Sequence, residues 1–425
     1  MRLSKLERAT EARKALIAGY EGLGVARVSR KVAEELQLRL ETSTVSMLSS
    51  AVIPDDLCET RSPTSVTEDF LLAVDIGGTT LKSAIISTVD FQVAEQWAYN
   101  IPHRIVDIAF FNRIVQWVCE CVFSYVGRRR CRFLVGTTFS FPLNTKNEIT
   151  TMGKGFQMTE EVRNVSLQEI LEQSFAHVMA RNTKYHFEVS LGGIVNDTIA
   201  VFWTNKMLHG GDDTAMILGT GINFCFALPF SAVPRAKLPA ACPEDVQLLI
   251  NSEAGFLGGN FLPLSQFDQH HDDQAAPFMP LEYLTAGKWI PLSLRNALAY
   301  CGISPIRDTE FTGEFLAAII DGHARDLFRA EEFPAVQELA RTLVDRAAFC
   351  LHATICGIHR FRYGDDPGSV VTISFAGSFL RFCTYYYEKL KEVSAGKIKY
   401  TFLPDSNLLG ASLFAAYHAA RREAP

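Results

Sequence analysis

The stretch FLLAVDIGGTTLKSAIIS, residues 70–87, decides how the rest of the chain is interpreted. Its first five residues are apolar, as in a buried strand, and Asp75 follows directly after them. Gly77 and Gly78 come next, and adjacent glycines accept the positive φ that a hairpin turn requires. The stretch therefore predicts a strand, a tight turn and a second strand.

The second strand begins with hydroxyl groups and a cation, from Thr79, Thr80 and Lys82. A turn with exposed backbone N–H groups beside such side chains is typical of an anion cradle. Asp75 stands where a carboxylate holds a metal ion, directly or through water. These features indicate ATP phosphates with magnesium, although an ordinary hairpin that carries two glycines explains the same pattern.

The same order of strand, glycine turn and strand returns at residues 214–228. Gly219, Thr220 and Gly221 separate two apolar runs there. Two such hairpins suggest a duplicated architecture with a site between the halves. Because expected strands and helices alternate along the chain, the fold class is α/β.

Composition narrows the class of protein further. The 425 residues suffice for two or three domains, and the net charge of −6 gives no indication of a nucleic-acid partner. No run reaches the roughly 18 apolar residues of a membrane span, and the first residues lack a signal-peptide core. Ten cysteines without a CxxC pair indicate reduced thiols. We expect a cytoplasmic protein without a membrane partner.

Asp197 is the candidate catalytic base. It lies between Asn196 and Thr198 at the start of an expected helix, directly after an apolar stretch. All three residue types also cap helices, and a capping role is compatible with a catalytic one. Sugar hydroxyls both donate and accept hydrogen bonds, so a sugar site needs several carboxylate, amide and hydroxyl groups. Polar residues at the ends of apolar segments that suit this purpose are Ser140, Lys154, Asn196, Asn223, Glu253 and Glu282.

Other ligand sites are less well supported by the sequence. The run from His270 to Asp273 contains two histidines and two aspartates, but adjacent residues rarely point at one ion, and no metal site is expected. The sequence contains no Walker A motif, no GxGxxG after a strand and no protein-kinase catalytic loop. These absences argue against three common types of nucleotide-binding protein.

Eight short motifs, taken in order, resemble the hexokinase family over roughly residues 10 to 420. Each motif is weak alone, but their common order is specific. Within that family the chain looks most like the fungal N-acetylglucosamine kinases. The motifs are DIGGTT (75–80), FSFP (139–142), GKGF (153–156), NDT (196–198), GTGIN (219–223), NSE (251–253), Glu282 before Ala286–Gly287, and AGS (376–378).

The resemblance implies a two-lobed actin-like ATPase (ribonuclease H-like) fold that closes on a sugar. Residues 1–65 would form a helical segment and linker, 66–206 the small subdomain and 207–425 the large subdomain. It also implies phosphorylation of a sugar 6-hydroxyl, most similar to that of N-acetylglucosamine, with Asp197 taking the proton. The alternatives are a kinase for glucose or another hexose, and a non-catalytic hexokinase-like regulator that senses sugar.

The resemblance assigns further residues to the two substrates. Gly153 and Ala254 would join the six polar residues above around the sugar, and Ala254 would leave room for an acetamido group. Magnesium would be carried by ATP, without a dedicated protein cage. The ATP site would consist of Asp75, Gly77, Gly78, Thr79, Thr80, Lys82, Gly219, Thr220, Gly221, Gly377 and Ser378.

The chain departs from the usual pattern of the family at several places, and one of them is Ser406-Asn407-Leu408, where many members have Gly-Ser-Gly. Thr80 and Lys82 stand where ordinary hexokinases have Asn and Arg, and a lysine lacks the bidentate fork of an arginine. Gly153 replaces a threonine, and Ala254 replaces an aromatic residue. These departures make glucose a doubtful substrate.

Overall fold

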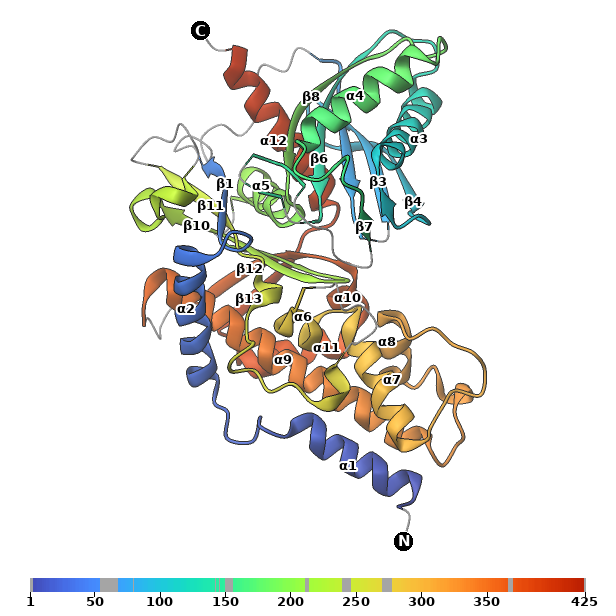
Figure 1. The fold of residues 1–425 in the computed structure, drawn as a ribbon, viewed down its shortest axis with the longest axis vertical. Helices are drawn as coiled ribbons and strands as arrows, with labels where there is room; N and C mark the ends of the chain where they lie inside the picture. The colour runs from blue at the N-terminus through green and yellow to red at the C-terminus, as the bar shows by residue number, and fades with distance from the viewer. Residues whose placement is uncertain are drawn as a thin grey trace.

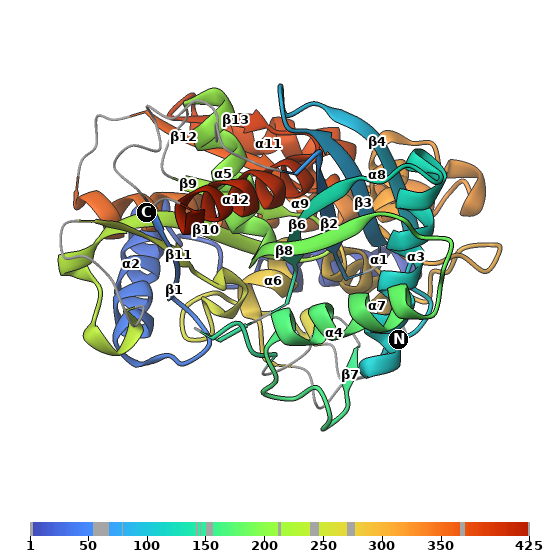
Figure 2. The same cartoon turned by 90° about the horizontal axis from the view of Figure 1, so that it is seen from above.

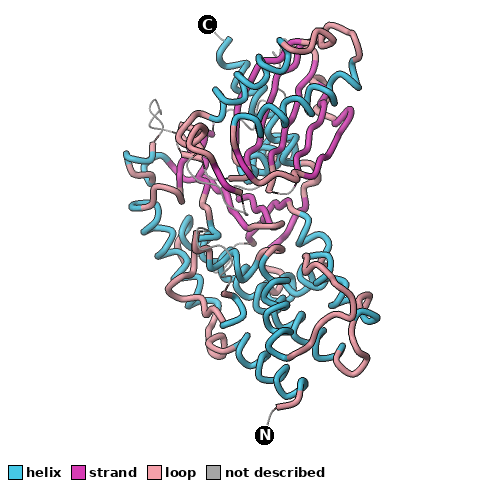
Figure 3. Tube along the Cα trace, turned by 45° about the vertical axis from the view of Figure 1, so that its right-hand side comes forward, coloured by secondary structure: helices cyan, strands magenta, loops and turns pink. Residues whose placement is uncertain are grey.

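The chain forms two lobes, each built on one β-sheet (Figure 1). Figure 3 shows strands in the upper lobe and across the middle of the molecule, with a largely helical lower part. The computed structural model describes residues 3–53, 68–78, 80–141, 143–144, 146–149, 156–210, 214–238, 246–269, 277–365 and 370–423.

The small lobe contains a five-stranded sheet in the order β4-β3-β2-β6-β8. The expected hairpin is its centre: β2 and β3 are antiparallel, and Asp75 pairs with Lys82. Strands β6 and β8 continue the sheet in parallel from β2. The strands are β2 (Phe70–Ile76), β3 (Thr80–Ser87), β4 (Val93–Asn100), β6 (Arg132–Phe139) and β8 (Glu188–Val195), with a separate pair β5 (Ile105–Val106) and β7 (Gln157–Met158).

Both faces of this sheet are buried. Successive side chains of a strand point to opposite faces, so Leu72 and Val74 join one core while Leu71 and Ala73 join another. Helices α3 (Ile108–Val126) and α4 (Leu167–Ala180) cover the first face. This double burial explains why β2 is an uninterrupted apolar run.

The large lobe contains a six-stranded sheet in the order β1-β11-β10-β9-β12-β13. The second expected hairpin, β9 and β10, occupies its middle. Long helix α9 (Phe333–Tyr363) contributes many buried residues to the core below the sheet. The strands are β1 (Leu48–Ile53), β9 (Thr214–Leu218), β10 (Ile222–Pro229), β11 (Gln247–Asn251), β12 (Val371–Ala376) and β13 (Ile398–Phe402), and the other helices are α1 (Lys5–Ile17), α2 (Val25–Thr42), α6 (Pro280–Thr285), α7 (Trp289–Cys301), α8 (Gly313–Asp321), α10 (Ser378–Phe382) and α11 (Thr384–Ser394).

Two helices lie between the sheets and join the lobes. Helix α5 (Asp197–His209) and helix α12 (Ser406–Glu423) lie side by side in both views (Figures 1 and 2). Trp203 of α5 is fully buried, and its ring lies 5.4 Å from that of Phe414 in α12. Because α5 begins with Asp197, this packing fixes the candidate base at the boundary between the lobes.

The subdomain limits differ from the expected ones at both ends of the chain. Residues 1–65 do not form a separate unit where they are described: Leu16 and Leu36 are fully buried in the large-lobe core, and β1 extends the large-lobe sheet by pairing with β11. The C-terminal helix α12 returns to the small lobe, where Ala411 and Ala415 join the core against β2 and β6. Burial of these apolar faces explains both differences.

The helical stretch after residue 280 breaks around Gly287, four residues before Pro291. Helix α6 ends at Thr285 and α7 begins at Trp289, with Gly287 between them. Pro291 lies in the first turn of α7, where a missing N–H costs no helical hydrogen bond. The break places Glu282 on a short, separately oriented helix. No helix in the described part of the chain has the length and apolar character of a membrane span.

Candidate active site

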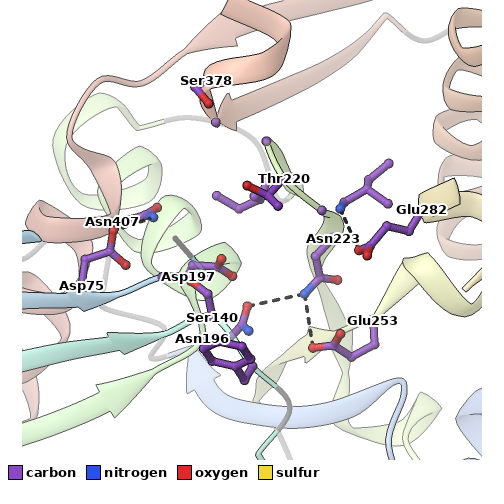
Figure 4. Close-up of a pocket in the computed structure, with 18 of the residues that line it drawn as sticks. Asp75, Ser140, Asn196, Asp197, Thr220, Asn223, Glu253, Glu282, Ser378 and Asn407 are labelled. Atoms are coloured by element: carbon purple, nitrogen blue, oxygen red, sulfur yellow. Dashed lines mark hydrogen bonds between the residues drawn. The ribbon is translucent and has the colours of Figure 1, made fainter. Parts of the chain in front are cut away.

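A cavity of about 260 Å³ lies at the boundary of the two lobes (Figure 4). Most of the predicted site residues line it, and both glycine turns contribute. The lining residues predicted from the sequence are Asp75, Gly77, Gly78, Thr80, Lys82, Ser140, Asn196, Asp197, Gly219, Thr220, Gly221, Asn223, Glu253, Glu282, Gly377 and Ser378.

Asp197 is held in place by the helix that it begins. Asn196 is the N-cap of α5, and its side chain accepts a hydrogen bond of 2.9 Å from the Thr198 N–H. The Asp197 carboxylate accepts from the same N–H at 2.8 Å. An anion is favoured at a helix N-terminus, because unpaired N–H groups point toward it. The bond from the Thr198 N–H uses Oδ1 of Asp197 and not Oδ2. The carboxylate can therefore be anchored through one oxygen and present the other to the cavity.

Asp75 is a buried carboxyl at the end of β2. Its Oδ1 accepts a hydrogen bond from the Thr138 hydroxyl, and its Oδ2 accepts a weaker one of 3.4 Å from the Asn407 amide. Burial raises the pKa of Asp75, and the carboxylate of Asp197 adds to this rise, whereas the Thr138 hydroxyl and Lys82 oppose it. The pKa of Asp75 therefore depends partly on the neighbouring Asp197 carboxylate.

On the large lobe, three side chains form one hydrogen-bond network. The Asn223 amide donates to Asn251 Oδ1 at 2.7 Å, and the Asn251 amide donates to Glu253 Oε1 at 2.8 Å. Asn251 is therefore a positioning residue that links two proposed sugar ligands. It belongs to the NSE motif, but nothing in that motif separates its role from that of Glu253.

Glu253 adopts an uncommon backbone conformation, with φ of 48° and ψ of 50°. Left-handed backbone is uncommon for residues other than glycine, and it persists where the surroundings enforce it. Here β11 precedes Glu253, and a short helical turn, Ala254–Phe256, follows it. The conformation turns the carboxylate back toward the cavity and the Asn251 amide.

Glu282 is oriented by two donors from different elements. Its Oε1 accepts from the Trp289 indole at 3.0 Å, and its Oε2 accepts from the Ile222 N–H at 3.3 Å. Gly221 permits this approach, because a Cβ there would lie 2.6 Å from Glu282 Oε2. The second glycine turn and α6 are therefore fitted to each other.

A second cavity, of about 510 Å³, adjoins the first. The two cavities share five lining residues from both glycine turns and from the start of α10, which are Gly78, Thr80, Gly219, Thr220 and Ser378. Beyond these, the second cavity is lined by Arg104 and Lys288, which the sequence analysis missed. Neither belongs to a recognisable motif, and only the fold brings them to the turns.

Some predicted site residues lie outside the part of the chain that the structure describes, and the prediction for Ala254 is not supported. Thr79, Gly153, Lys154 and the run 270–273 lie outside the described residues. Ala254 is fully buried in the large-lobe core and is not among the residues that line the cavity. Because the Ala254 side chain is packed in this core, it does not form the wall that was expected to make room for an acetamido group.

The acidic residues of the cavity suit a magnesium ion that is bound mainly by substrate phosphates and water. Among the described residues, no three His, Cys, Asp or Glu side chains gather as a metal cage. Magnesium commonly uses one or two carboxylates together with water and substrate phosphates. Asp75, beside the Gly77–Gly78 turn, fits such a partial contribution.

Comparisons with known proteins agree with this geometry. Two models of the hexokinase family match residues 22–207 and 213–417. The chain is 23% identical to N-acetylglucosamine kinase 1 of Candida albicans over 84% of each chain, and 22% identical to hexokinase-1 of Arabidopsis thaliana over 84% of this chain and 81% of the relative. A hexokinase from Schistosoma mansoni complexed with glucose superposes with a TM-score of 0.70 at 17% identity, over 97% of this chain and 98% of the other. The predicted two-lobed fold class is confirmed.

Proposed function

The chain belongs to the hexokinase family, and we propose that it transfers the γ-phosphoryl group of ATP to the 6-hydroxyl of N-acetylglucosamine. It is a sugar kinase, and kinases of this family use ATP with Mg²⁺. The choice of N-acetylglucosamine as substrate is supported by a chemical difference between the two ends of the cavity. Asp197 lies at one end, and the other end combines carboxylates with an apolar wall.

Asp197 is the proposed general base. Phosphoryl transfer depends chiefly on positioning and on stabilisation of charge. An anchored carboxylate at the cavity wall can accept the proton of a hydroxyl as that oxygen attacks phosphorus. At the α5 N-terminus, unpaired backbone N–H groups favour a negatively charged side chain such as that of Asp197.

The two glycine turns are the proposed phosphate site. Gly78 and Thr80 from the first turn and Gly219 and Thr220 from the second line both cavities, so the boundary between the cavities is where sugar and phosphate would meet. Backbone N–H groups at glycine turns bind anions well. Gly377 and Ser378 would lie against the adenosine side. Magnesium supplies charge neutralisation at the phosphates when bound, and Asp75 would hold it, directly or through water.

The preference for an N-acetyl sugar rests on the far end of the cavity. In a pyranose ring, C2 lies opposite C5, which carries the 6-hydroxymethyl group. With O6 at Asp197, the C2 substituent therefore points toward the opposite end. Figure 4 places Asp197 on one side of Asn223, and Glu253 and Glu282 on the other. The hydroxyls at that end would bind the two glutamates.

Apolar side chains lie beside those glutamates. Phe256, Pro277 and Met279 all line the cavity. The Met279 methyl is close to both Gly255 and Glu282, because a Cβ on Gly255 would lie 2.5 Å from Met279 Cε and 3.3 Å from Glu282 Cβ. Phe256 is held by Arg39, which donates to its carbonyl at 2.7 Å. This wall would cover an acetyl methyl, whereas a glucose hydroxyl would gain nothing from it.

A coupled ADP-release assay over N-acetylglucosamine, glucose and mannose tests the proposal. We expect the highest kcat/KM with N-acetylglucosamine. Met279→Ala should lower kcat/KM for N-acetylglucosamine roughly fourfold, which corresponds to about 0.8 kcal/mol for one buried methyl group, and should leave glucose nearly unchanged.

Phe278→Ala is the matched control, because Phe278 is exposed and does not line the cavity. It should leave both sugars unaffected. A wild-type preference for glucose would overturn the substrate assignment, and equal losses on both sugars in Met279→Ala would overturn the role of the wall.

A further inference from the structure

A separate cavity of about 570 Å³ lies within the small lobe, outside the cleft. Strands β3 and β4 and helices α3 and α4 enclose it (Figure 2 shows α3 beside β3 and β4). Its volume falls within the usual range of small-molecule sites, roughly 300–1,000 Å³. None of the residues assigned to sugar or ATP lines it.

The interior of this cavity is apolar and partly aromatic. Leu81, Phe110 and Ile114 line it, and each is buried. Tyr99 and Trp117 form an aromatic wall, with ring centroids 5.8 Å apart. Tyr99 is 42% exposed, so this wall is accessible from solvent. An apolar chain or ring of a ligand would contact these surfaces.

The rim of the cavity is basic. Arg113, Arg181, His103 and His177 line it, and its described lining includes no Asp or Glu. Asp107 Oδ1 lies 3.9 Å from Arg113 and also accepts a hydrogen bond from the Phe110 N–H as the cap of α3. Two guanidinium groups at the mouth of an apolar cavity match a ligand with an apolar body and an anionic head.

Glu120 of α3 is already paired with a cation. It accepts hydrogen bonds from Lys184 at 2.8 Å and from Tyr185 at 2.7 Å. Gln116 lies between it and the cavity and donates to it at 2.8 Å. The basic rim therefore keeps its attraction for an anion.

We propose that this cavity is a regulatory site for an amphipathic organic anion, distinct from the catalytic cleft. Strand β3 connects the two sites. Leu81 faces the cavity and pairs with Tyr99, whereas its neighbours Thr80 and Lys82 line the cleft. An occupant would thus contact the opposite face of the strand that carries the phosphate-binding groups.

A second connection runs through the segment after β4. His103 lines the cavity, and the adjacent Arg104 donates a hydrogen bond to the carbonyl of Gly78 in the glycine turn. Arg104 also lies 4.6 Å from the ring centroid of Phe156, which fixes its direction. A shift of residues 103–104 would therefore move the Arg104 guanidinium, which donates to the carbonyl of Gly78 in the first glycine turn.

Octanoate is the probe, because it combines an apolar chain with one carboxylate. Titration of the full chain by calorimetry should show saturable binding of octanoate, binding of 1-octanol at least tenfold weaker, and no binding of acetate. Trp117 fluorescence should change over the same concentration range, and this change should be absent in Trp117→Phe. Saturating N-acetylglucosamine should not displace octanoate.

Arg113→Gln with Arg181→Gln should weaken octanoate binding at least tenfold, because a charge-assisted pair is lost. Arg163→Gln is the matched control: it is an exposed small-lobe arginine, paired with Glu160 and outside the cavity. Equal affinity for octanoate and octanol, or unchanged affinity in the double variant, would overturn the site.

The regulatory part has its own test. A non-hydrolysable ATP analogue should change the Kd of octanoate at least threefold, since coupling between two sites is reciprocal. An unchanged Kd would overturn regulation. Concentration-dependent dimerisation that octanoate does not reverse would instead identify the cavity as a contact between copies of the chain, and would also overturn the proposal.

Discussion

The two glycine hairpins share one local design but supply different chemistry. In the first, β2–β3, Asp75 and Lys82 belong to the strands themselves and occupy opposite positions in the strand register. In the second, β9–β10, the strand residue Asn223 is neutral, and the carboxylates come from Glu253 and Glu282 on other elements. The two turns therefore share a local design, while the chemistry around each turn depends on its neighbours.

This contrast explains what the sequence could and could not predict. The first hairpin was predicted from its residues alone, because the strand, the turn, Asp75 and Lys82 lie within 18 residues. Around the second hairpin, Asn251 and Glu282 are distant in sequence from the turn at Gly219–Gly221. They come close to it only because β11 pairs with β10 and α6 packs beside the turn. Glu253 and Glu282 were predicted from their positions at the ends of apolar segments and from the motif order of the family, but neither pattern predicted the positioning role of Asn251.

Tertiary packing decided the remaining differences. Ala254 follows a proposed sugar ligand in sequence, but the left-handed backbone of Glu253 sends its side chain into the core. Strand β4 was not expected, because an edge strand with exposed residues lacks an apolar pattern. Residues 1–65 were expected to form a helical segment and linker outside the two subdomains, yet one face of each of their helices is apolar and buried against the large lobe.

The largest expected effect concerns the residue that lies between the two hairpins. Asp197→Asn keeps the shape of the side chain but removes the base, and should lower kcat roughly 10²–10⁴-fold. The Kd for N-acetylglucosamine, measured by calorimetry, should change little. Asp107→Asn alters another acidic residue at a helix start, outside the cleft, and should leave kcat unchanged. Normal turnover by Asp197→Asn would show that Asp197 is not the catalytic base.

Alanine at each glycine turn should separate the functions of the hairpins. Gly221→Ala would place a Cβ 2.6 Å from Glu282 Oε2, so the glutamate must move and KM for the sugar should rise roughly 10–100-fold. Gly77→Ala would place a Cβ 2.8 Å from the Thr80 carbonyl oxygen, which widens the turn and should raise mainly KM for ATP.

Gly24→Ala is the control for both variants, because a Cβ there would meet nothing within 4 Å. Steady-state kinetics with each substrate varied in turn would distinguish the effects. If both variants raised the same KM by similar factors, the functional difference between the hairpins would not hold.

The smallest expected effect is a shift in pH dependence. Burial raises the pKa of Asp75, and Lys82 partly opposes this rise. Lys82→Met should therefore raise the pKa further, so that the carboxylate becomes ionised only at higher pH. If ionised Asp75 supports phosphate binding, the acid limb of kcat/KM for ATP should move to higher pH. Lys146→Met, at an exposed small-lobe position, should not move it; a shift to lower pH in Lys82→Met would contradict the assigned role.

The central claim is that the cleft directs the 6-hydroxyl of N-acetylglucosamine toward Asp197 and phosphorus. Phosphorus-31 NMR of the product formed from N-acetylglucosamine and ATP tests this claim most directly. The account predicts one phosphomonoester signal, coupled to the two protons on C6. A product phosphorylated at C1, or no sugar phosphate while glucose is converted, would contradict it.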